Sequence, residues 1–570
     1  MENKKEFIEN MFQRGLLISG DLLEKKVDSS VIGRLEHEGD LLVLNTDYLE
    51  IVAQQKILVD WYMIDGYRVA VEKDRDDELY RAQLQSFKEV SLKLPDQISS
   101  GKQHQQLHST ETESCVPDHE DTNFSFASSV AEAPPQESLI SSIEAAPAFF
   151  SPDNVQIVIS YKNEPRKYEV KDFTSFFSSR YRFLENILRN RQELLATMPI
   201  NRILGKKEKE SISIIGIIED ISETKNGNLM LTIEDSTGRI KAVVSQNKKE
   251  LHAKAKDLVL DEVVGIIGIS GDKIIFVEDV IWPDIPLTNQ LKKGEKEEYA
   301  VFLSDVHVGS KLFLKEEFDK FLHWISGNLG SPAQRSMASK VKYVIIAGDL
   351  VDGVGIYPSQ QEELEIKEIV AQYEEFCRLI KQIPADKQII ICPGNHDAVH
   401  LAEPQSSFDK NFSPALFTLP NVTLVTNPAL VNIGKTKTFS GFDVLLYHGY
   451  SFDYYVAKVE SIRNNGGYHR ADLIMKFLLK RRHLSPSFRS TPYYPGHKED
   501  PLIIKKIPDF FVSGHIHYSK VDNYRGVTIV CGSCWQGTTA FQEKLGHQPE
   551  PARVPVVNLK TREMKILRFG

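Results

Sequence analysis

Short apolar runs recur along the second half of the chain, and most of them end in a polar or glycine-rich segment. Six of these runs predict buried strands: Ala300–Leu303, Val341–Ile346, Gln388–Cys392, Val444–Tyr447, Phe510–Ser513 and Val527–Val530. Between the second and third, the segment Glu363–Ile383 carries apolar residues at helical spacing and predicts an amphipathic helix. Because buried strands alternate with helices, residues 297–570 are expected to form an α/β domain.

A different pattern occupies residues 208–288, where β-type runs follow one another closely. The five runs are Ser211–Ile218, Asn228–Glu234, Ile240–Ser245, Val263–Ile269 and Lys273–Ile281. A short helical stretch, Lys248–Lys256, lies between the third and the fourth. This order predicts an OB-type barrel. Such barrels bind single strands or serve as packing modules, and the lack of a clear aromatic set on these strands favours packing.

The first 207 residues divide into three parts. Residues 1–75 show short helical patterns and predict a small helical module used for docking. Residues 76–150 become rich in Gln, Ser, Glu, His and Pro and predict a largely disordered linker. Residues 151–207 predict a strand-helix connector, whose helix carries an aromatic stripe flanked by Arg180, Arg182, Arg189 and Arg191. That stripe is consistent with nucleic-acid contact or with packing on the next domain, and packing is the simpler interpretation.

Composition narrows the class of protein. A chain of 570 residues is too long for one core, and its net charge of −10 argues against tight DNA binding by this chain alone. Five cysteines are too few for a disulfide framework and fit a reducing compartment. Cys531 and Cys534 have CxxC spacing, but they follow an apolar run and are expected to be buried thiols. With no apolar run near the roughly 20 residues of a membrane span and no signal-peptide core, we expect a cytoplasmic protein without membrane association.

The predicted strands of the α/β domain are followed by residues that bind metals. The candidate ligands are Asp305, His307, Asp349, Asn395, His448, His515 and His517. Side chains just past the carboxyl ends of such strands converge on one rim of the sheet, so these residues are expected to meet. Together they offer enough oxygen and imidazole ligands for two divalent metals, an arrangement that attacks phosphate esters.

These segments resemble the calcineurin-like metallophosphoesterases, whose D-x-H, G-D-x-x-D, G-N-H-D, H and G-H-x-H blocks occur here in order between residues 297 and 540. The resemblance implies a β-sandwich flanked by helices. It implies that Asp305, His307 and His517 hold one metal, that Asn395, His448 and His515 hold the other, and that Asp349 bridges them. Mn²⁺ is the expected ion for both sites.

The same resemblance assigns the catalytic residues. It implies that His396 protonates the leaving oxygen or stabilises the transition state, and that Asp352 orients His396 by accepting its second N–H. Asp397 is expected to be structural or to lie behind the ligands. Protein phosphatases of this family carry an arginine after the G-D-x-x-D block and read G-N-H-E, whereas this chain has Gly353 and G-N-H-D, which disfavours that activity.

The order of the predicted domains resembles the small subunits of archaeal family-D DNA polymerases, as do the segments Ser304–Ser310, Gly353–Pro358, Tyr447–Ser451 and Phe541–Gly546. This implies a metal-dependent 3′→5′ proofreading exonuclease in DNA replication, bound to a large catalytic polymerase subunit as a heterodimer or larger assembly. Its substrate would be single-stranded DNA or the frayed end of a primer–template. A cytosolic metallophosphatase or nucleotidase, and a polymerase scaffold without enzyme activity, remain the alternatives.

Two sets of residues are candidates for DNA contact in such an exonuclease. The aromatic candidates are Tyr357, Tyr450, Phe452, Tyr454, Tyr455, Tyr493 and Tyr494, which would stack on bases of any sequence. The basic run Lys480, Arg481, Arg482 and His483 would meet phosphates. For each residue, a buried aromatic ring or a solvated charge is the competing interpretation.

Overall fold

The computed structural model describes residues 17–18, 43–44, 155–162, 166–206, 208–545 and 547–570. Residues 1–132 and 133–570 form two compact units. In the first unit the described residues are a parallel pair, β1 (Leu17–Ile18) and β2 (Val43–Leu44). Apart from these four residues, the predicted helical module of residues 1–75 and the predicted linker of residues 76–150 lie outside the described residues.

Two six-stranded sheets form the centre of the second unit. The first sheet has the order β12-β11-β10-β9-β18-β19, and the second has the order β16-β17-β15-β14-β13-β3. The first comprises β12 (Val422–Leu424), β11 (Gln388–Cys392), β10 (Val341–Ala347), β9 (Tyr299–Leu303), β18 (Arg553–Asn558) and β19 (Met564–Arg568). The second comprises β16 (Lys520–Tyr524), β17 (Val527–Cys531), β15 (Phe510–Ser513), β14 (Phe442–Leu446), β13 (Ala429–Ile433) and β3 (Val155–Ile159). Strands β9 to β12 run parallel, as do β14, β15 and β17.

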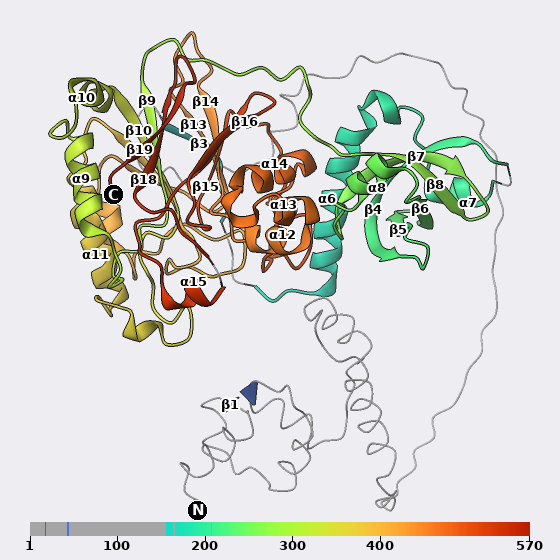
Figure 1. The fold of residues 1–570 in the computed structure, drawn as a ribbon, viewed down its shortest axis with the longest axis horizontal. Helices are drawn as coiled ribbons and strands as arrows, with labels where there is room; N and C mark the ends of the chain where they lie inside the picture. Colours follow the sequence, from blue (N-terminus) through green and yellow to red (C-terminus); the bar gives the residue numbers. More distant parts are fainter. Residues whose placement is uncertain (1–16, 19–42, 45–154, 163–165, 207, 546) are drawn as a thin grey trace, which may run out of the picture. The chain divides into compact units, whose positions relative to one another are not determined.

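The sheets pack face to face, with helices on both outer sides (Figure 1). Phe302 and Ile345 of the first sheet share a buried cluster with Val444 and Val512 of the second, which is the core of a β-sandwich. All six strands predicted for residues 297–570 are present, so the predicted α/β class is confirmed.

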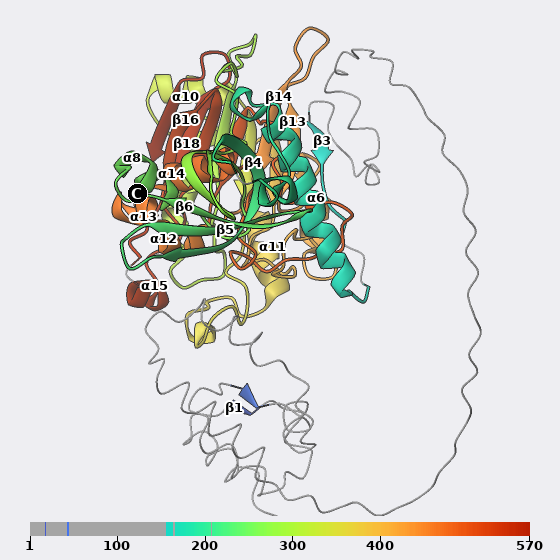
Figure 2. The ribbon, with the colours of Figure 1, turned by 90° about the vertical axis from the view of Figure 1, so that its right-hand side faces the viewer.

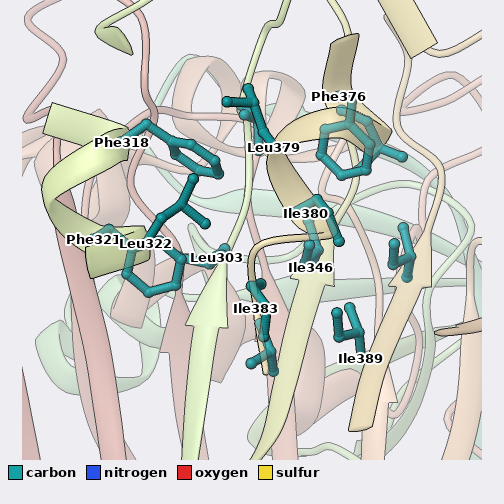
Figure 3. Close-up of a cluster of buried hydrophobic side chains, with 14 of the residues drawn as sticks. Leu303, Phe318, Phe321, Leu322, Ile346, Phe376, Leu379, Ile380, Ile383 and Ile389 are labelled. Carbon is teal, nitrogen blue, oxygen red and sulfur yellow. The ribbon is translucent and has the colours of Figure 1, made fainter. Parts of the chain in front are cut away.

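Helices α9 (Lys315–Ile325), α10 (Pro332–Ser339) and α11 (Ile369–Ile380) cover the first sheet. Figure 3 shows the aromatic and aliphatic side chains of α9 and α11 meeting those of β9, β10 and β11. Each such side chain contributes about 1.5–3 kcal/mol when fully buried. Helices α12 (Phe452–Lys458), α13 (Glu460–Asn464) and α14 (Ala471–Arg481) cover the second sheet.

A closed barrel of five strands follows the order β4-β5-β6-β8-β7. Its strands are β4 (Ser211–Glu223), β5 (Leu229–Asp235), β6 (Gly238–Val244), β7 (Val263–Ser270) and β8 (Ile274–Ile281). Helix α8 (Lys249–Ala255) lies between the third and fourth strands along the chain. Short helix α7 (Ile200–Leu204) precedes the barrel, and its Ile200 and Ile203 belong to the barrel core. All five predicted strands and the intervening helix are present.

The strand and the helix predicted for the connector over residues 151–207 are present, but the strand, β3, belongs to the second sheet. It pairs antiparallel with β13 and is the outer strand of the second sheet (Figure 2). The sandwich therefore begins before the barrel and resumes after it. Nothing local in the sequence shows this, because the hydrogen-bonded residues Tyr161 and Thr426 are 265 positions apart.

Helix α6 (Val170–Arg189) packs on both the barrel and the sandwich, as the simpler interpretation of its stripe predicts. Leu184 and Leu188 belong to a buried cluster with barrel residues. On the sandwich side, the centres of the Phe176 and Tyr493 rings are 5.4 Å apart. Arg180 is buried rather than solvated, and its Nε lies 2.6 Å from the Asp500 carboxylate.

The basic run 480–483 belongs to the same junction. Arg481 is paired with Glu262 at 2.7 Å, and His483 lies 2.8 Å from Asp500. Arg482 donates to the carbonyl of Ile504, and the Lys480 ammonium lies 3.8 Å from the centre of the Trp282 ring. Arg481, Arg482 and His483 are buried, so the hypothesis that this run meets DNA phosphates is wrong.

The helix predicted over Glu363–Ile383 begins later, at Ile369. The amides of Glu365 and Ile366 both donate to the carbonyl of Gly309, which holds this segment as a loop against the turn after β9. Within the described part of the chain, no helix has both the length and the apolar character needed to cross a membrane.

Candidate metal centre

All seven predicted metal ligands lie just beyond the carboxyl ends of parallel strands. Asp305 and His307 follow β9, Asp349 follows β10 and Asn395 follows β11 in the first sheet. His448 follows β14, and His515 and His517 follow β15 in the second sheet. The two sheets therefore deliver ligands to one rim of the sandwich.

One group at this rim contains Asp305, His307 and His517, whose potential ligand atoms lie within 4.8 Å of one another. The Nε2 atoms of His307 and His517 are 3.0 Å apart. Nε2 of His517 is also 3.4 Å from Oδ1 of Asp305. Two nitrogens sharing an ion at about 2.0–2.1 Å would be roughly 3 Å apart, so this spacing fits a common metal.

A second group contains Asp349, His448 and His515, again with potential ligand atoms within 4.8 Å of one another. Nε2 of His448 lies 2.9 Å from Oδ1 of Asn395 and 3.2 Å from Oδ2 of Asp349. The same Asp349 oxygen is 3.9 Å from Nε2 of His307 in the first group. Asp349 thus faces both groups, as expected for a bridging carboxylate.

The histidines are held so that particular nitrogens face these groups. Nδ1 of His448 donates to the carbonyl of Ala347 at 2.8 Å, which leaves Nε2 for a ligand. Nε2 of His515 lies 3.0 Å from Oδ2 of Asp453, which leaves Nδ1. A carbonyl or carboxylate partner on one nitrogen fixes the ring orientation and directs the other nitrogen toward the site.

The backbone at the rim adopts a conformation that side-chain-bearing residues rarely take. Asp305, His307, Asp349, His515 and His517 all have left-handed φ values, between 51° and 72°. Each such residue costs roughly 1–2 kcal/mol relative to a right-handed one. Strain of this kind concentrates at functional sites, where the surrounding structure enforces it.

Two glycines make room for the carboxylates. A Cβ atom on Gly394 would lie 2.2 Å from Oδ1 of Asp349, and one on Gly514 would lie 2.5 Å from Oδ2 of Asp305. Both distances are shorter than any tolerable contact, so glycine is required at each position. This explains why glycines recur in the sequence blocks that carry the ligands.

Histidines are the ion-pair partners of the buried aspartates at the rim. Asp305, Asp349 and Asp352 are buried, and in the described part of the chain none of them pairs with a lysine or arginine. Burial alone would raise the pKa of Asp349, but His448 and His396 hold it well below its usual value. Burial alone would lower the pKa of His448, but Asp349 and Asp305 raise it to about 9.

A potential that holds a proton on a buried imidazole also favours a divalent cation. The residues present therefore fit two metal ions. Carboxylate, amide and imidazole donors together suit Mn²⁺, Fe²⁺, Zn²⁺ or Ni²⁺ better than Mg²⁺.

Asp352 accepts from His396, as the resemblance implies, but through its main chain. Nδ1 of His396 donates to the backbone carbonyl of Asp352 at 2.8 Å, not to its carboxylate. The Asp352 carboxylate lies 3.2 Å from Nδ1 of His307, and this nitrogen makes no well-formed hydrogen bond. The same carboxylate accepts hydrogen bonds from the side-chain amides of Gln360 and Gln536. Asp352 therefore orients His396 through its main chain, and its side chain faces a predicted ligand of the first group.

Asp397 has the structural role expected for it. Its carboxylate accepts from the Gly394 amide at 2.9 Å, from the Tyr373 hydroxyl at 3.0 Å and from the Leu350 amide at 3.3 Å. Burial and the nearby Asp349 raise the pKa of Asp397 to about 7.

Several residues that support the rim were missed in the sequence. Asp453, which contacts His515, lies five residues beyond His448, but it stands in an apolar-aromatic stretch that gives no sign of this role. Asn427 accepts from the His448 amide and donates to Gln405, which in turn donates to the carbonyl of Gly394. These amides connect the loops after β11 and β14, and no spacing rule would have found them.

The aromatic candidates separate into two kinds. Phe452 and Tyr455 are buried in the core of the second sheet, and Tyr454 packs against that core. Tyr493 donates its hydroxyl to Ser485 and stacks on Phe488, so it is part of the α6 junction. Tyr357, Tyr450 and Tyr494 are half-buried: the first is 6.4 Å from the His396 ring and the second is 5.6 Å from the His515 ring. Cys531 and Cys534 are buried free thiols, as expected.

The part of the sequence that forms most of the sandwich and its rim of carboxylates and histidines matches a known protein family. Residues 300–521 match the DNA polymerase alpha/epsilon B-subunit family. That match includes all seven predicted ligand positions, from Asp305 to His517, so it covers the whole candidate centre.

Individual relatives are more specific. The chain is 37% identical to the DNA polymerase II small subunit of Methanothermobacter thermautotrophicus over 70% of this chain and 80% of that protein. It is 39% identical to that of Methanocaldococcus jannaschii over 68% and 64%, and 38% identical to that of Archaeoglobus fulgidus over 68% and 75%, respectively. The chain belongs to the family of archaeal DNA polymerase II small subunits, which confirms the relationship predicted from its sequence.

Similarity to a solved asparaginyl-tRNA synthetase from Pyrococcus horikoshii is limited to 15% of this chain and 21% of that one. With 22% identity and a TM-score of 0.14, it has no bearing on the fold or the function.

Proposed function

We propose that this chain is a metal-dependent 3′→5′ exonuclease that hydrolyses phosphodiester bonds at single-stranded or frayed DNA ends. The observation that carries the proposal is the position of Asp349, whose one oxygen lies 3.2 Å from His448 and 3.9 Å from His307. A carboxylate facing two ligand groups is what a two-metal phosphoesterase centre requires. On this proposal the sandwich is of the calcineurin-like type and the five-stranded barrel is of the OB type.

Asp305, His307 and His517 would hold one ion, and Asn395, His448 and His515 the other, with Mn²⁺ as the expected metal in both. Such ions, when bound, supply a nucleophilic water at neutral pH and neutralise charge on the phosphate. The chain itself provides the fixed geometry. Its left-handed ligand positions and the amides of Gln405 and Asn427 keep the loops in place.

His396 is the proposed proton donor to the leaving oxygen. Its Nδ1 is engaged with the Asp352 carbonyl, so Nε2 is the nitrogen available for proton transfer. Burial lowers the pKa of His396. A lowered pKa disfavours the protonated imidazole that this step needs. We expect the negative charge of a bound phosphodiester to raise the pKa again and so to favour the protonated form.

Membership of a small-subunit family leads us to propose a large catalytic polymerase subunit as the partner, in a heterodimer or larger assembly. In that assembly the exonuclease would remove misincorporated nucleotides during DNA replication. The net charge of −10 is consistent with a subunit whose DNA binding depends on its partner.

The direct test is release of mononucleotides from 3′-labelled single-stranded and 3′-mismatched DNA by the full chain with Mn²⁺. We expect activity that a chelator removes. His396→Ala should lower the rate by about 10²–10⁴-fold, the range for loss of a general acid, without changing Mn²⁺ binding measured by calorimetry.

Other outcomes would identify the alternatives. Hydrolysis of nucleotides or phosphoproteins with intact DNA ends would indicate a metallophosphatase or nucleotidase. A scaffold would give two results together. The chain would show no nuclease activity, and variants without the predicted ligands would still support full polymerase activity with the large subunit.

A further inference from the structure

A strip of aromatic rings lies on the surface beside the loop that carries Asn395 and His396. Its members are His400, Tyr494 and Tyr168. The first two rings stack with centres 5.4 Å apart and an angle of 21°, and Tyr168 meets Tyr494 edge to face at 5.2 Å. The Arg166 guanidinium extends the strip, 5.1 Å from the centre of the Tyr168 ring. His400 and Arg166 are exposed, and the two tyrosines are half-buried.

The strip connects directly to the candidate metal centre. Nε2 of Gln405 lies 3.2 Å from the carbonyl of Gly394 and 3.3 Å from the carbonyl of His400. The residue after Gly394 is the predicted ligand Asn395. The Tyr494 amide donates to the carbonyl of Glu403 at 2.8 Å, which holds its segment beside the same loop. His400, five residues after Asn395, is thus the member of the strip that shares a loop with a predicted ligand, and the ring contacts lead from it to Tyr494, Tyr168 and Arg166.

The local sequence allows these rings to meet. A Cβ atom on Gly496 would lie 2.7 Å from the Tyr494 ring and 3.0 Å from the Tyr168 hydroxyl, so glycine keeps the two rings in contact.

Charge around the strip differs from that of the whole chain. Lys167 precedes Tyr168 in the chain, and Lys498 follows His497, whose ring centre lies 6.3 Å from that of Tyr494. Lys162 follows Tyr161, whose ring meets His497 at 5.3 Å. All three lysines are exposed, and none of them forms an ion pair with a carboxylate of the described residues. The neighbouring acids are already engaged: Asp172 with Arg166, Glu169 with Lys171 and Glu499 with Lys505. The strip therefore combines ring faces with available cations although the chain carries a net charge of −10.

We propose that this strip binds the bases of single-stranded DNA upstream of the scissile 3′ nucleotide. Aromatic rings stack on bases of any sequence, and flanking cations meet the phosphates, which is the combination that single-strand binding requires. The inference rests on the proposed exonuclease function and names the path of its substrate. The basic run 480–483 cannot supply this path, because its arginines are buried in ion pairs and carbonyl contacts.

The barrel offers the competing path. Phe276 is 48% exposed and Ile269, its neighbour across strands β7 and β8, is 37% exposed. These two side chains provide one ring and no adjacent series of rings, so we favour the strip.

The test compares Tyr494→Leu, Tyr168→Leu and His400→Ala in the full chain with Mn²⁺. Leucine keeps apolar packing while removing the ring. For an oligothymidylate of about ten nucleotides, each variant should raise KM about tenfold with kcat within about twofold, as expected for loss of one base-stacking contact. The ratio of kcat/KM for this oligonucleotide to that for a dinucleotide should fall by the same factor. Phe412→Leu, which removes a ring that is 47% exposed elsewhere, is the matched control and should change neither value.

Binding measured without cleavage separates this inference from the exonuclease proposal. Fluorescence anisotropy of the labelled oligothymidylate in Ca²⁺ should show the same loss of about tenfold in affinity for each variant. A 5-iododeoxyuridine placed near the 3′ end should crosslink to the peptides that contain Tyr494 or Tyr168.

Unchanged KM and affinity in all three variants, with crosslinks to the peptide of Phe276, would overturn the strip in favour of the barrel. If the wild-type chain binds and crosslinks at the strip but cleaves nothing, the exonuclease proposal fails and the strip stands. Urea unfolding of each variant shows whether it is folded, and His400→Ala changes an exposed side chain, so at least one informative variant remains.

Discussion

The molecule buries two clusters of charged side chains that are balanced in opposite ways. At the α6 junction, Arg180 pairs with Asp500 at 2.6 Å and Arg481 pairs with Glu262 at 2.7 Å, so each carboxylate has a guanidinium. At the rim of the sandwich, three buried aspartates have histidines as their ion-pair partners, and in the described residues no lysine or arginine pairs with them. A buried charge is costly unless it is paired. The first cluster is complete in itself, whereas the second has the composition of a site that a cation would complete, as the proposed function requires.

This difference also shows how misleading residue type alone can be. The basic run 480–483 has the composition of a phosphate-binding segment, yet its charges serve the junction. On the proposed function, the acidic and histidine-rich segments would approach a phosphate, with metal ions between them. The following predictions test whether the two clusters divide stability and activity in this way.

The largest effect should come from Asp349→Ala, because this residue faces both ligand groups. We expect exonuclease activity to fall by at least about 10³-fold, which corresponds to about 4 kcal/mol of transition-state stabilisation. The measurement is mononucleotide release under saturating Mn²⁺. Asp272→Ala removes an exposed carboxylate from the barrel and should leave the rate unchanged. Equal activity of the two variants would contradict the bridging role.

Arg180→Met should affect stability more than any change at the rim. It leaves the Asp500 carboxylate buried without its guanidinium, and we expect a loss of about 3–5 kcal/mol in the free energy of unfolding. Urea denaturation measures this. Arg182→Met, on the exposed face of the same helix, should change stability by less than about 0.5 kcal/mol. A small effect of Arg180→Met would mean that the junction tolerates an unpaired carboxylate.

Mn²⁺ should stabilise the wild-type chain by about 2.7 kcal/mol for each ion bound, at a concentration one hundred times the Kd of that site. Thermal unfolding across a Mn²⁺ titration, with a chelator as the reference, provides the measurement. Asp349→Asn should remove most of this stabilisation, whereas Arg180→Met should retain it even though its midpoint is lower. Stabilisation that persists in Asp349→Asn would place the ion elsewhere.

Acid should weaken the junction through His483. Burial, followed by the nearby Arg180, lowers the pKa of His483 to about 4. In the unfolded chain a histidine titrates near 6.5, so as the pH falls from about 6.5 to about 4 only the unfolded state gains this proton. Stability is therefore complete above pH 6.5 and should decrease by about 3 kcal/mol over that interval.

Urea unfolding at a series of pH values would show this slope, and His483→Gln should flatten it. Asp500, whose pKa is also lowered, contributes its own loss at still lower pH. A slope that is the same in the wild type and in His483→Gln would assign the acid sensitivity to other groups.

The smallest effect is expected for Asp453→Asn. The carboxylate lies 3.0 Å from Nε2 of His515 and orients a predicted ligand without being one. Loss of such a contact lowers metal affinity by about 10–100-fold. Calorimetry of Mn²⁺ binding would measure this, with Asp272→Asn as the control, and restored activity at high Mn²⁺ would distinguish positioning from catalysis.

The sequence predicted those features that depend on short-range pattern. Every strand of the barrel and the six strands predicted for the sandwich could be found because apolar runs and turn residues are local signals. The seven candidate ligands could be found because each follows such a run. Left-handed φ values at five of them could not be predicted, since only the surrounding fold enforces that strain.

What the sequence did not predict depends on distant partners. Asp453, Gln405 and Asn427 acquire their roles from loops that meet only in the folded chain. The burial of Arg481 follows from Glu262, which lies in the barrel more than two hundred positions away. The carboxylate of Asp352 faces His307, and only its main-chain carbonyl accepts from His396. The spacing of residues in the sequence does not reveal in which direction this side chain points.

The pairing of β3 with β13 has a consequence for how the protein is made. A ribosome releases β3 and then the whole barrel long before it synthesises the strand that β3 joins. The nascent chain must therefore carry β3 without its partner strand until β13 has been made. A truncated version that starts at the barrel would expose the backbone edge of β13, so expression of the C-terminal part alone should favour edge-to-edge aggregation.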